Sequence, residues 1–163
     1  MTLTDAVGEG KDQLDGATKP FPEIARHYHE AGQPWIAVGD ENWGEGSSRE
    51  HAAMEPRFRG AKAIIVRSFA RIHEANLKKQ GVLALTFDDP SVYDVIGEDD
   101  RISIVGLAGL APGTQVECVL TKPDGTPRKL MSAEWGTRTS PVGRVKLCIR
   151  DRKSTRLNSS HGY

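Results

Sequence analysis

Residues 35–53 read WIAVGDENWGEGSSREHAA, and they decide the fold of this 163-residue chain. The short apolar run at residues 35–39 predicts a buried strand. A polar, glycine-rich loop follows at residues 40–47. A short helix is then expected from Ser48 to about Glu55, where Pro56 should stop it. A strand that leads through such a loop into a helix is typical of the first half of a βαβ unit.

The flanking segments continue this alternation. Helices are expected at residues 22–32 and 69–80, the second with Gly81 as its C-cap, and a short helix at residues 90–96. Apolar or alternating runs predict further strands at residues 61–66, 82–87, 101–105, 116–121 and 128–131. We therefore expect an α/β fold with a parallel βαβαβ core and antiparallel strands packed beside it.

Charge and hydropathy argue against a nucleic-acid-binding protein and a membrane-spanning protein. The chain carries 22 basic and 22 acidic residues, but seven basic groups and one acid lie in residues 138–163. Residues 1–137 therefore have a net charge of about −6, which argues against nucleic-acid binding. No apolar run approaches the roughly 20 residues that span a bilayer. No signal peptide is visible at the start of the sequence.

The two cysteines, Cys118 and Cys148, lie far apart and form no CxxC pattern. This spacing excludes a zinc or iron–sulfur site made from cysteines of this chain alone, and we expect no metal ligand in it. A structural disulfide is not expected either, so the cysteine usage fits a reducing compartment.

The loop between the first predicted strand and its helix carries the candidate chemistry. Gly44 and Gly46 allow tight turns, and two hydroxyls and a guanidinium follow at Ser47, Ser48 and Arg49. These groups lie where the N-terminus of a helix favours an anion. A guanidinium can also hold a carboxylate through two parallel hydrogen bonds. The residues predict a site for a small carboxylate or phosphate.

The same loop has a purely structural interpretation. Ser47 and Glu50 match the capping box, in which the serine caps the helix and the glutamate reaches back to it. The residues by themselves leave both interpretations open. Near the second helix, Arg67 and Arg71 are expected to be ordinary surface charges, and His73 a hydrogen-bonded histidine.

Two blocks of the sequence resemble the aconitase family. Residues 39–53 resemble the loop of its swivel domain. Residues 67–81, RSFARIHEANLKKQG, resemble a second block of the same family, and Leu85-Thr86-Phe87 follows in the expected order. Arg49-Glu50-His51 and the ending at residues 78–81 resemble the mitochondrial-type branch. The resemblance covers roughly residues 20–135.

The resemblance implies a fold, an activity and site residues. The fold is a swivelling β/β/α domain that packs on the cluster-bearing domains of aconitase. Aconitase is a hydro-lyase of the tricarboxylic acid cycle that interconverts citrate and isocitrate through cis-aconitate. At the matching positions, Ser47 is implied to be the catalytic base, while Ser48 and Arg49 bind substrate. The [4Fe–4S] cluster of the family is held by three cysteines on other domains. The chain is therefore expected to be an inactive piece of a longer enzyme that binds no cluster itself.

Two alternatives to this hypothesis come from the same residues. The small subunit of an isopropylmalate-type isomerase also carries a Gly-Ser-Ser-Arg-Glu-His loop, although the block at residues 67–81 favours aconitase. A non-catalytic module could instead keep the carboxylate pocket without the chemistry.

The sequence also suggests domain limits and a compartment. We expect a linker at residues 1–20, the swivel domain at residues 21–136, and a non-native or disordered tail at residues 137–163. The basic tail resembles translated sequencing adaptor. Such a tail favours a bacterial cytoplasm as the compartment, with the mitochondrial matrix as the alternative.

Overall fold

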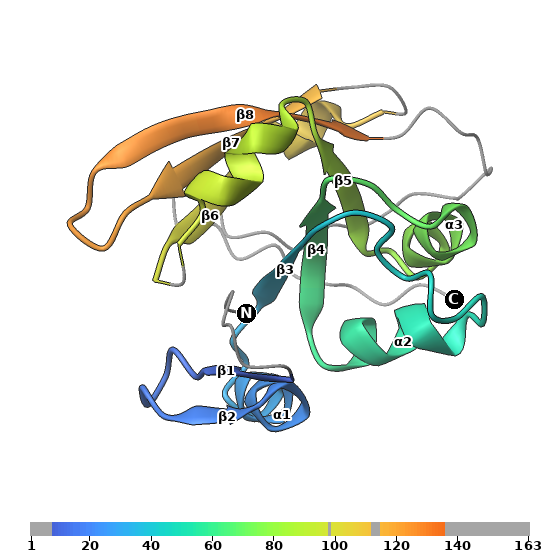
Figure 1. Ribbon diagram of the computed structural model, residues 1–163, viewed down its shortest axis with the longest axis horizontal. Coiled ribbons are helices and arrows are strands. Elements are labelled where there is room, and N and C mark those ends of the chain that lie inside the picture. Colours follow the sequence, from blue (N-terminus) through green and yellow to red (C-terminus); the bar gives the residue numbers. More distant parts are fainter. Residues whose placement is uncertain (1–7, 98, 112–114, 136–163) are drawn as a thin grey trace.

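The computed structural model describes residues 8–97, 99–111 and 115–135 (Figure 1). Most of its strands form one six-stranded sheet in the order β3-β4-β5-β8-β7-β6, and β1 and β2 form a separate hairpin. The predicted tail, with Cys148, lies outside the described residues.

Three strands form the parallel half of the sheet: β3 (Trp35–Gly39), β4 (Ala61–Val66) and β5 (Leu83–Phe87). The helices of this half are α1 (Phe21–Glu30), α2 (His51–Phe58), α3 (Arg71–Lys79) and the 3₁₀ helix η1 (Pro90–Val95). α2 and α3 are the crossover helices of the predicted βαβαβ core, which is confirmed. Because the strands are parallel, the loops that follow their carboxyl ends lie at one edge of the sheet.

The other three strands are antiparallel: β6 (Arg101–Val105), β7 (Gln115–Thr121) and β8 (Pro127–Trp135), with a 3₁₀ turn η2 (Leu107–Gly109) after β6. β8 pairs with β5, so the antiparallel strands continue the same sheet. The α/β fold class is confirmed. The predicted antiparallel strands do lie beside the parallel core, and the β5–β8 hydrogen bonds join the two halves into one sheet.

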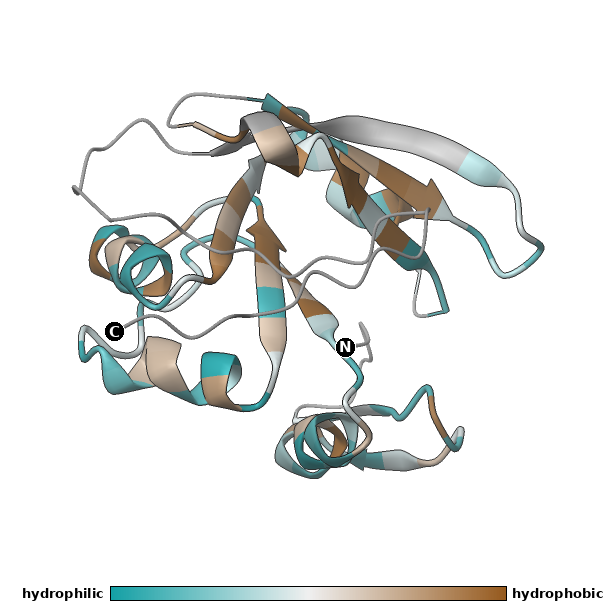
Figure 2. Cartoon of the chain, turned by 180° about the vertical axis from the view of Figure 1, so that it is seen from behind, coloured by the Kyte–Doolittle hydropathy of each residue, from teal (hydrophilic) through white to brown (hydrophobic). Residues whose placement is uncertain are grey.

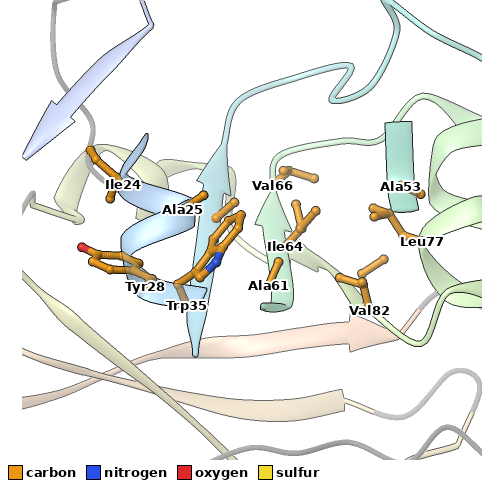
Figure 3. Close-up of a cluster of buried hydrophobic side chains, with 12 residues drawn as sticks. Ile24, Ala25, Tyr28, Trp35, Ala53, Ala61, Ile64, Val66, Leu77 and Val82 are labelled. Carbon is orange, nitrogen blue, oxygen red and sulfur yellow. The ribbon is translucent and has the colours of Figure 1, made fainter. Parts of the chain in front are cut away.

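Both faces of the parallel half are buried, as its apolar strands require. On the helix side, Ile64 and Val66 of β4 pack with side chains of α1, α2 and α3 (Figure 3). Ala63 and Ile65 point to the opposite face, where they meet side chains of β5, β6, β7 and η1. Burial on both faces explains why residues 63–66 of β4 form an unbroken apolar run.

Hydropathy follows the same layers (Figure 2). The strands at the centre of the molecule are hydrophobic, and the outer sides of the helices are hydrophilic. Within the described residues, no helix is long and apolar enough to cross a membrane.

Helix α2 differs from its predicted limits at both ends. It begins at His51 rather than Ser48, and it runs past Pro56 to Phe58. A proline removes one backbone donor from a helix. The ladder resumes beyond it, because the backbone N–H of Arg59 donates to the carbonyl of Glu55 at 3.0 Å. Pro56 therefore interrupts one hydrogen bond of α2 without ending the helix.

The segment predicted to be a linker contains the hairpin of β1 (Glu9–Lys11) and β2 (Thr18–Pro20). Its turn holds Asp12, whose side chain is fully buried. One carboxylate oxygen of Asp12 accepts hydrogen bonds from Lys19 Nζ at 3.0 Å and from His27 Nδ1 of α1 at 2.6 Å. The glycines and acids that suggested a loop are thus those of a tight turn attached to α1. The domain boundary at residue 21 stays a prediction.

The hydrogen bonds to Asp12 also shift its pKa. Burial on its own would raise the pKa of the carboxyl group. Hydrogen bonds from His27, the Leu14 backbone and Lys19 outweigh burial, so the pKa falls from 3.8 to about 2. Folding therefore favours the ionised form of Asp12.

We expect Asp12→Asn to lower the free energy of unfolding at neutral pH by about 1–3 kcal/mol, because the amide removes the buried negative charge beside Lys19 and His27 and one of the two acceptor oxygens. The folded-state pKa is the lower one. The contribution of Asp12 is therefore complete above pH 3.8 and disappears as the pH falls from 3.8 to about 2. Urea unfolding across this range should show the difference between wild type and variant shrinking.

Asp15→Asn is the matched control, since Asp15 also binds Lys19 but is exposed. It should change the free energy of unfolding less than Asp12→Asn does. Equal losses from the two variants would show that burial of Asp12 has no special effect.

Candidate functional site

The polar loop at residues 40–50 leaves the carboxyl end of β3 and is fixed to the loop after β4. The backbone N–H of Trp43 donates to the carbonyl of Ser68, and the N–H of Ala70 donates to the carbonyl of Trp43, both at 3.0 Å. The hydroxyl of Ser68 also accepts from the Asn42 backbone at 2.9 Å. The two blocks singled out in the sequence are therefore brought together, and the second supports the first.

Two glycines make this approach possible. A Cβ on Gly39 would lie 2.1 Å from the ring of Trp43, and a Cβ on Gly44 would lie 2.2 Å from the ring of His73. Gly44 also has a φ of 89°, a conformation that other residues rarely adopt. The loop can follow its course only with glycine at these two positions.

The three candidate residues lie in sequence at the outer end of this loop, ahead of α2. Ser47 is half-buried, whereas Ser48 and Arg49 are exposed. The hydroxyl oxygen of Ser47 accepts a hydrogen bond from the Arg49 backbone N–H at 3.2 Å. The structure thus brings Ser47, Ser48 and Arg49 together at one helix start.

The capping box is not formed. The N-cap of α2 is Glu50, and no side chain caps the helix. The carboxylate of Glu50 instead accepts a hydrogen bond from Gln80 Nε2 at 2.7 Å. The helix starts only at His51, and the Ser47 hydroxyl forms a local turn with the Arg49 backbone.

Several donors at this position are available to an anion. Among the described residues, the backbone N–H groups of Ser48, Glu50 and His51 donate to no partner. The Arg49 guanidinium likewise has no ion pair within that part of the chain. Free N–H groups at a helix start, next to an unpaired cation, can bind a carboxylate or phosphate.

Arg67 behaves differently, and it is not an ordinary surface charge. Its guanidinium binds Asp40 at 3.1 Å, Asp94 at 2.8 Å and the carbonyl of Pro90 at 3.0 Å. It also lies over the ring of Tyr93, 4.7 Å from the centroid. Arg67 therefore joins the first residue of the site loop to η1.

His73 differs from expectation too. It is 4% exposed, and its Nδ1 has no hydrogen-bond partner in the described part of the chain. Burial lowers the pKa of His73, which favours the neutral ring. Its ring borders an apolar pocket of about 380 Å³ that Trp35 and Trp43 also line. In the described part of the chain, Nδ1 of His73 therefore lacks the hydrogen bond that was predicted for this histidine.

Sequence reasoning missed two residues that contact the loop, Asn76 and Gln80. Asn76 is buried, and its Nδ2 donates to the carbonyl of Ser48 at 3.4 Å. Its spacing from His73 and Gln80, three and four residues, puts all three side chains on one side of a helix. This spacing was the feature of the sequence from which contacts of all three side chains with one neighbouring segment could have been predicted.

The described residues do not fit an iron–sulfur cluster. Cys118 is fully buried on β7, and burial raises the pKa of its thiol to about 12, so it is not a thiolate ligand. Among the described residues, Asp12, Asp15 and His27 lie close enough together to hold a metal ion. Lys19 already binds both carboxylates there, so the cluster is satisfied by a cation of the chain itself.

Comparison with known protein families identifies the family of this chain. The sequence model of the aconitase C-terminal domain matches residues 1–90, more than half of the chain. The chain belongs to the aconitase C-terminal domain family. The resemblance of the two sequence blocks to aconitase is thereby confirmed.

Curated relatives agree with this family. The chain is 62% identical over 109 residues to the probable mitochondrial aconitate hydratase of Dictyostelium discoideum, and 56% identical over 117 residues to the mitochondrial aconitate hydratase of Saccharomyces cerevisiae. These matches cover 67% and 72% of this chain. They cover 14% and 15% of the two relatives, so the chain spans about one seventh of their length.

Among solved structures, a 3-isopropylmalate dehydratase from Methanocaldococcus jannaschii is similar at 23% identity and a TM-score of 0.39. The match covers 60% of this chain and 51% of that one. A likeness of this size carries no argument for the isopropylmalate alternative.

The expectation of a bacterial cytoplasm is wrong. The aconitate hydratases that match the chain are named mitochondrial, and they come from slime mould, red alga, nematode and yeasts. The adaptor-like residues on which that expectation rested lie outside the part matched by the family, so they carry no information on the compartment.

We expect Arg67→Lys to loosen the aconitase-family loop. Lysine keeps the charge but cannot bind two carboxylates and a carbonyl with one planar group. The loss should be about 1 kcal/mol in the free energy of unfolding, since the two ion pairs are largely exposed. Amide hydrogen exchange at residues 40–44 should also become faster.

Arg57→Lys, at an exposed position of α2, is the control and should change neither quantity. Unchanged exchange at residues 40–44 in Arg67→Lys would contradict a role for Arg67 in holding the loop.

Proposed function

We propose that this chain is the substrate-binding and catalytic-base domain of an aconitate hydratase, a hydro-lyase that interconverts citrate and isocitrate through cis-aconitate. The observation that carries the proposal is the loop at residues 44–50 in a member of the aconitase C-terminal domain family. In it, a half-buried serine precedes Arg49 by two residues at a helix start, and within the described part of the chain the guanidinium and three nearby backbone N–H groups have no partner. A dianionic or trianionic substrate matches these donors.

Ser47 is proposed as the base. In the dehydration step, its oxygen takes the proton from the substrate carbon next to a carboxylate. The hydroxyl on the neighbouring carbon departs, and with an added proton it leaves as water. Hydration reverses these steps, with Ser47 returning its proton to carbon.

A serine oxygen can act in this way only if its negative charge is stabilised. The Arg49 backbone N–H, which donates to Ser47 Oγ at 3.2 Å, supplies one fixed donor. The positive charge of Arg49, two residues away in the chain, would favour the same negative charge. Such prearranged donors usually provide the largest share of stabilisation for a developing oxyanion.

Ser48 and Arg49 are proposed to hold a substrate carboxylate. Both side chains are exposed, and neither is engaged elsewhere among the described residues. The planar guanidinium can bind a carboxylate with two parallel hydrogen bonds, while the serine hydroxyl donates a third. We propose that these hydrogen bonds orient the substrate next to Ser47.

The remaining parts of the reaction are proposed to come from the rest of a longer enzyme. The described cysteine does not fit the [4Fe–4S] cluster that the family implies, so we propose that cysteines outside this chain hold it. The swivel domain, proposed at residues 21–136, would pack on those cluster-bearing domains. The names of the relatives support the mitochondrial matrix as the compartment.

Ser47→Ala tests the base assignment. The segment of the Saccharomyces enzyme that matches this chain can be replaced by the corresponding residues of this chain, since the two are 56% identical. Loss of a positioned base should lower the kcat of this chimera for cis-aconitate hydration by about 10²–10⁴-fold. Circular dichroism and thermal unfolding should stay unchanged.

Ser103→Ala is the matched control, because Ser103 lies on β6 at the opposite edge of the sheet from β3. Its kcat should equal that of the wild-type chimera. Full turnover by Ser47→Ala would contradict the base assignment. A folded chimera that cannot hydrate cis-aconitate would contradict the proposed function itself.

A further inference from the structure

One side of α3 contacts the site loop at three successive points. His73 packs against Gly44, Asn76 donates to the carbonyl of Ser48, and Gln80 donates to the carboxylate of Glu50. Residues three and four apart lie on the same side of a helix. The helix therefore runs alongside the loop, and its contacts follow the loop in order from Gly44 to Glu50.

The central contact has the most direct consequence for Ser47. The carbonyl of Ser48 and the N–H of Arg49 belong to one planar trans peptide, so they point in opposite directions. Asn76 binds the carbonyl end of this peptide at 3.4 Å, near the long limit for a hydrogen bond. The other end of the peptide donates to Ser47 Oγ.

Burial makes the Asn76 contact specific. Asn76 is 6% exposed, so water cannot freely replace its amide as the partner of the Ser48 carbonyl. A buried amide that loses its partner destabilises the fold, which favours the orientation that keeps the bond. The peptide between Ser48 and Arg49 is thereby held in one orientation.

We propose that Asn76 is a positioning residue for Ser47: by holding the Ser48 carbonyl, it aims the Arg49 backbone N–H at the serine oxygen. His73 and Gln80 hold the loop on either side of this peptide. The inference rests on the proposed function, since it assigns Asn76 the task of fixing the donor that stabilises the base. Asn76 acts through the peptide and does not contact substrate.

Asn76→Leu and Asn76→Asp in the same chimera test this inference. Both side chains are close to asparagine in shape, and at neutral pH neither donates a hydrogen bond. Misplacement of a reacting group by a fraction of an ångström should lower kcat by at least about tenfold. The KM for isocitrate should change by less than about threefold, because the flexible Arg49 side chain can still reach a substrate carboxylate.

The pH dependence separates positioning from a structural role. A buried carboxyl group without a cationic partner has a raised pKa, and its protonated form regains an O–H donor. The kcat of Asn76→Asp, relative to wild type at the same pH, should therefore recover as the pH falls. The relative kcat of Asn76→Leu should stay low at every pH. If Asn76→Asp does not fold, the loss of kcat in Asn76→Leu tests the inference alone.

Lys79→Ala, at an exposed position of the same helix, is the control and should keep the kcat of the wild-type chimera. A wild-type kcat in folded Asn76→Leu, with Ser47→Ala inactive, would overturn the positioning role and leave the proposed function intact. Absence of pH-dependent recovery in folded Asn76→Asp would also overturn it. A wild-type chimera without hydratase activity would overturn the proposed function, and this inference with it.

Discussion

The pairing of Trp43 with residues 68–70 is the constraint on which the site depends. β3 and β4 are parallel neighbours with Gly39 opposite Val66, so the chain leaves both strands at the same level of the sheet. Two main-chain hydrogen bonds then join the loops that follow. This pairing brings the start of α3 under the loop, and the contacts of Gly39 with Trp43 and of Gly44 with His73 exist only because of it.

The contacts from α3 fix the site loop without using the side chains of Ser48 and Arg49. The contacts from α3 use the backbone of Gly44, the carbonyl of Ser48 and the side chain of Glu50. None of them uses the side chains of Ser48 or Arg49, which remain exposed. A loop fixed through its main chain can keep its reactive side chains free and still hold them in a defined place, as efficient catalysis requires.

Two arginines near the site illustrate how context decides the role of a charge. Arg67 is surrounded by Asp40, Asp94 and the ring of Tyr93, and it joins the site loop to η1. Arg49 has no partner within the described residues and lies beside free backbone N–H groups. Identical side chains therefore differ in role: Arg67 serves the internal architecture, whereas Arg49 has no ion pair among the described residues.

The sequence by itself determined the family and most elements of the sheet, although it missed the β1–β2 hairpin. Apolar runs bounded by glycine and proline predicted β3, β4 and β5 closely, because a strand buried on both faces must be apolar throughout. Residues 39–53 and 67–81 identified the family, and Ser47, Ser48 and Arg49 as its candidate site. Local patterns failed where distant groups compete. Ser47 and Glu50 form no capping box: α2 begins only at His51, and the Glu50 carboxylate binds Gln80, 30 residues away. Only the tertiary structure decided that the antiparallel strands continue the same sheet and that Asn76 binds the Ser48 carbonyl. It also decided that Arg67 is engaged while Arg49 has no ion pair among the described residues. Each of these depends on which segments the folded sheet places side by side, and no local propensity encodes that.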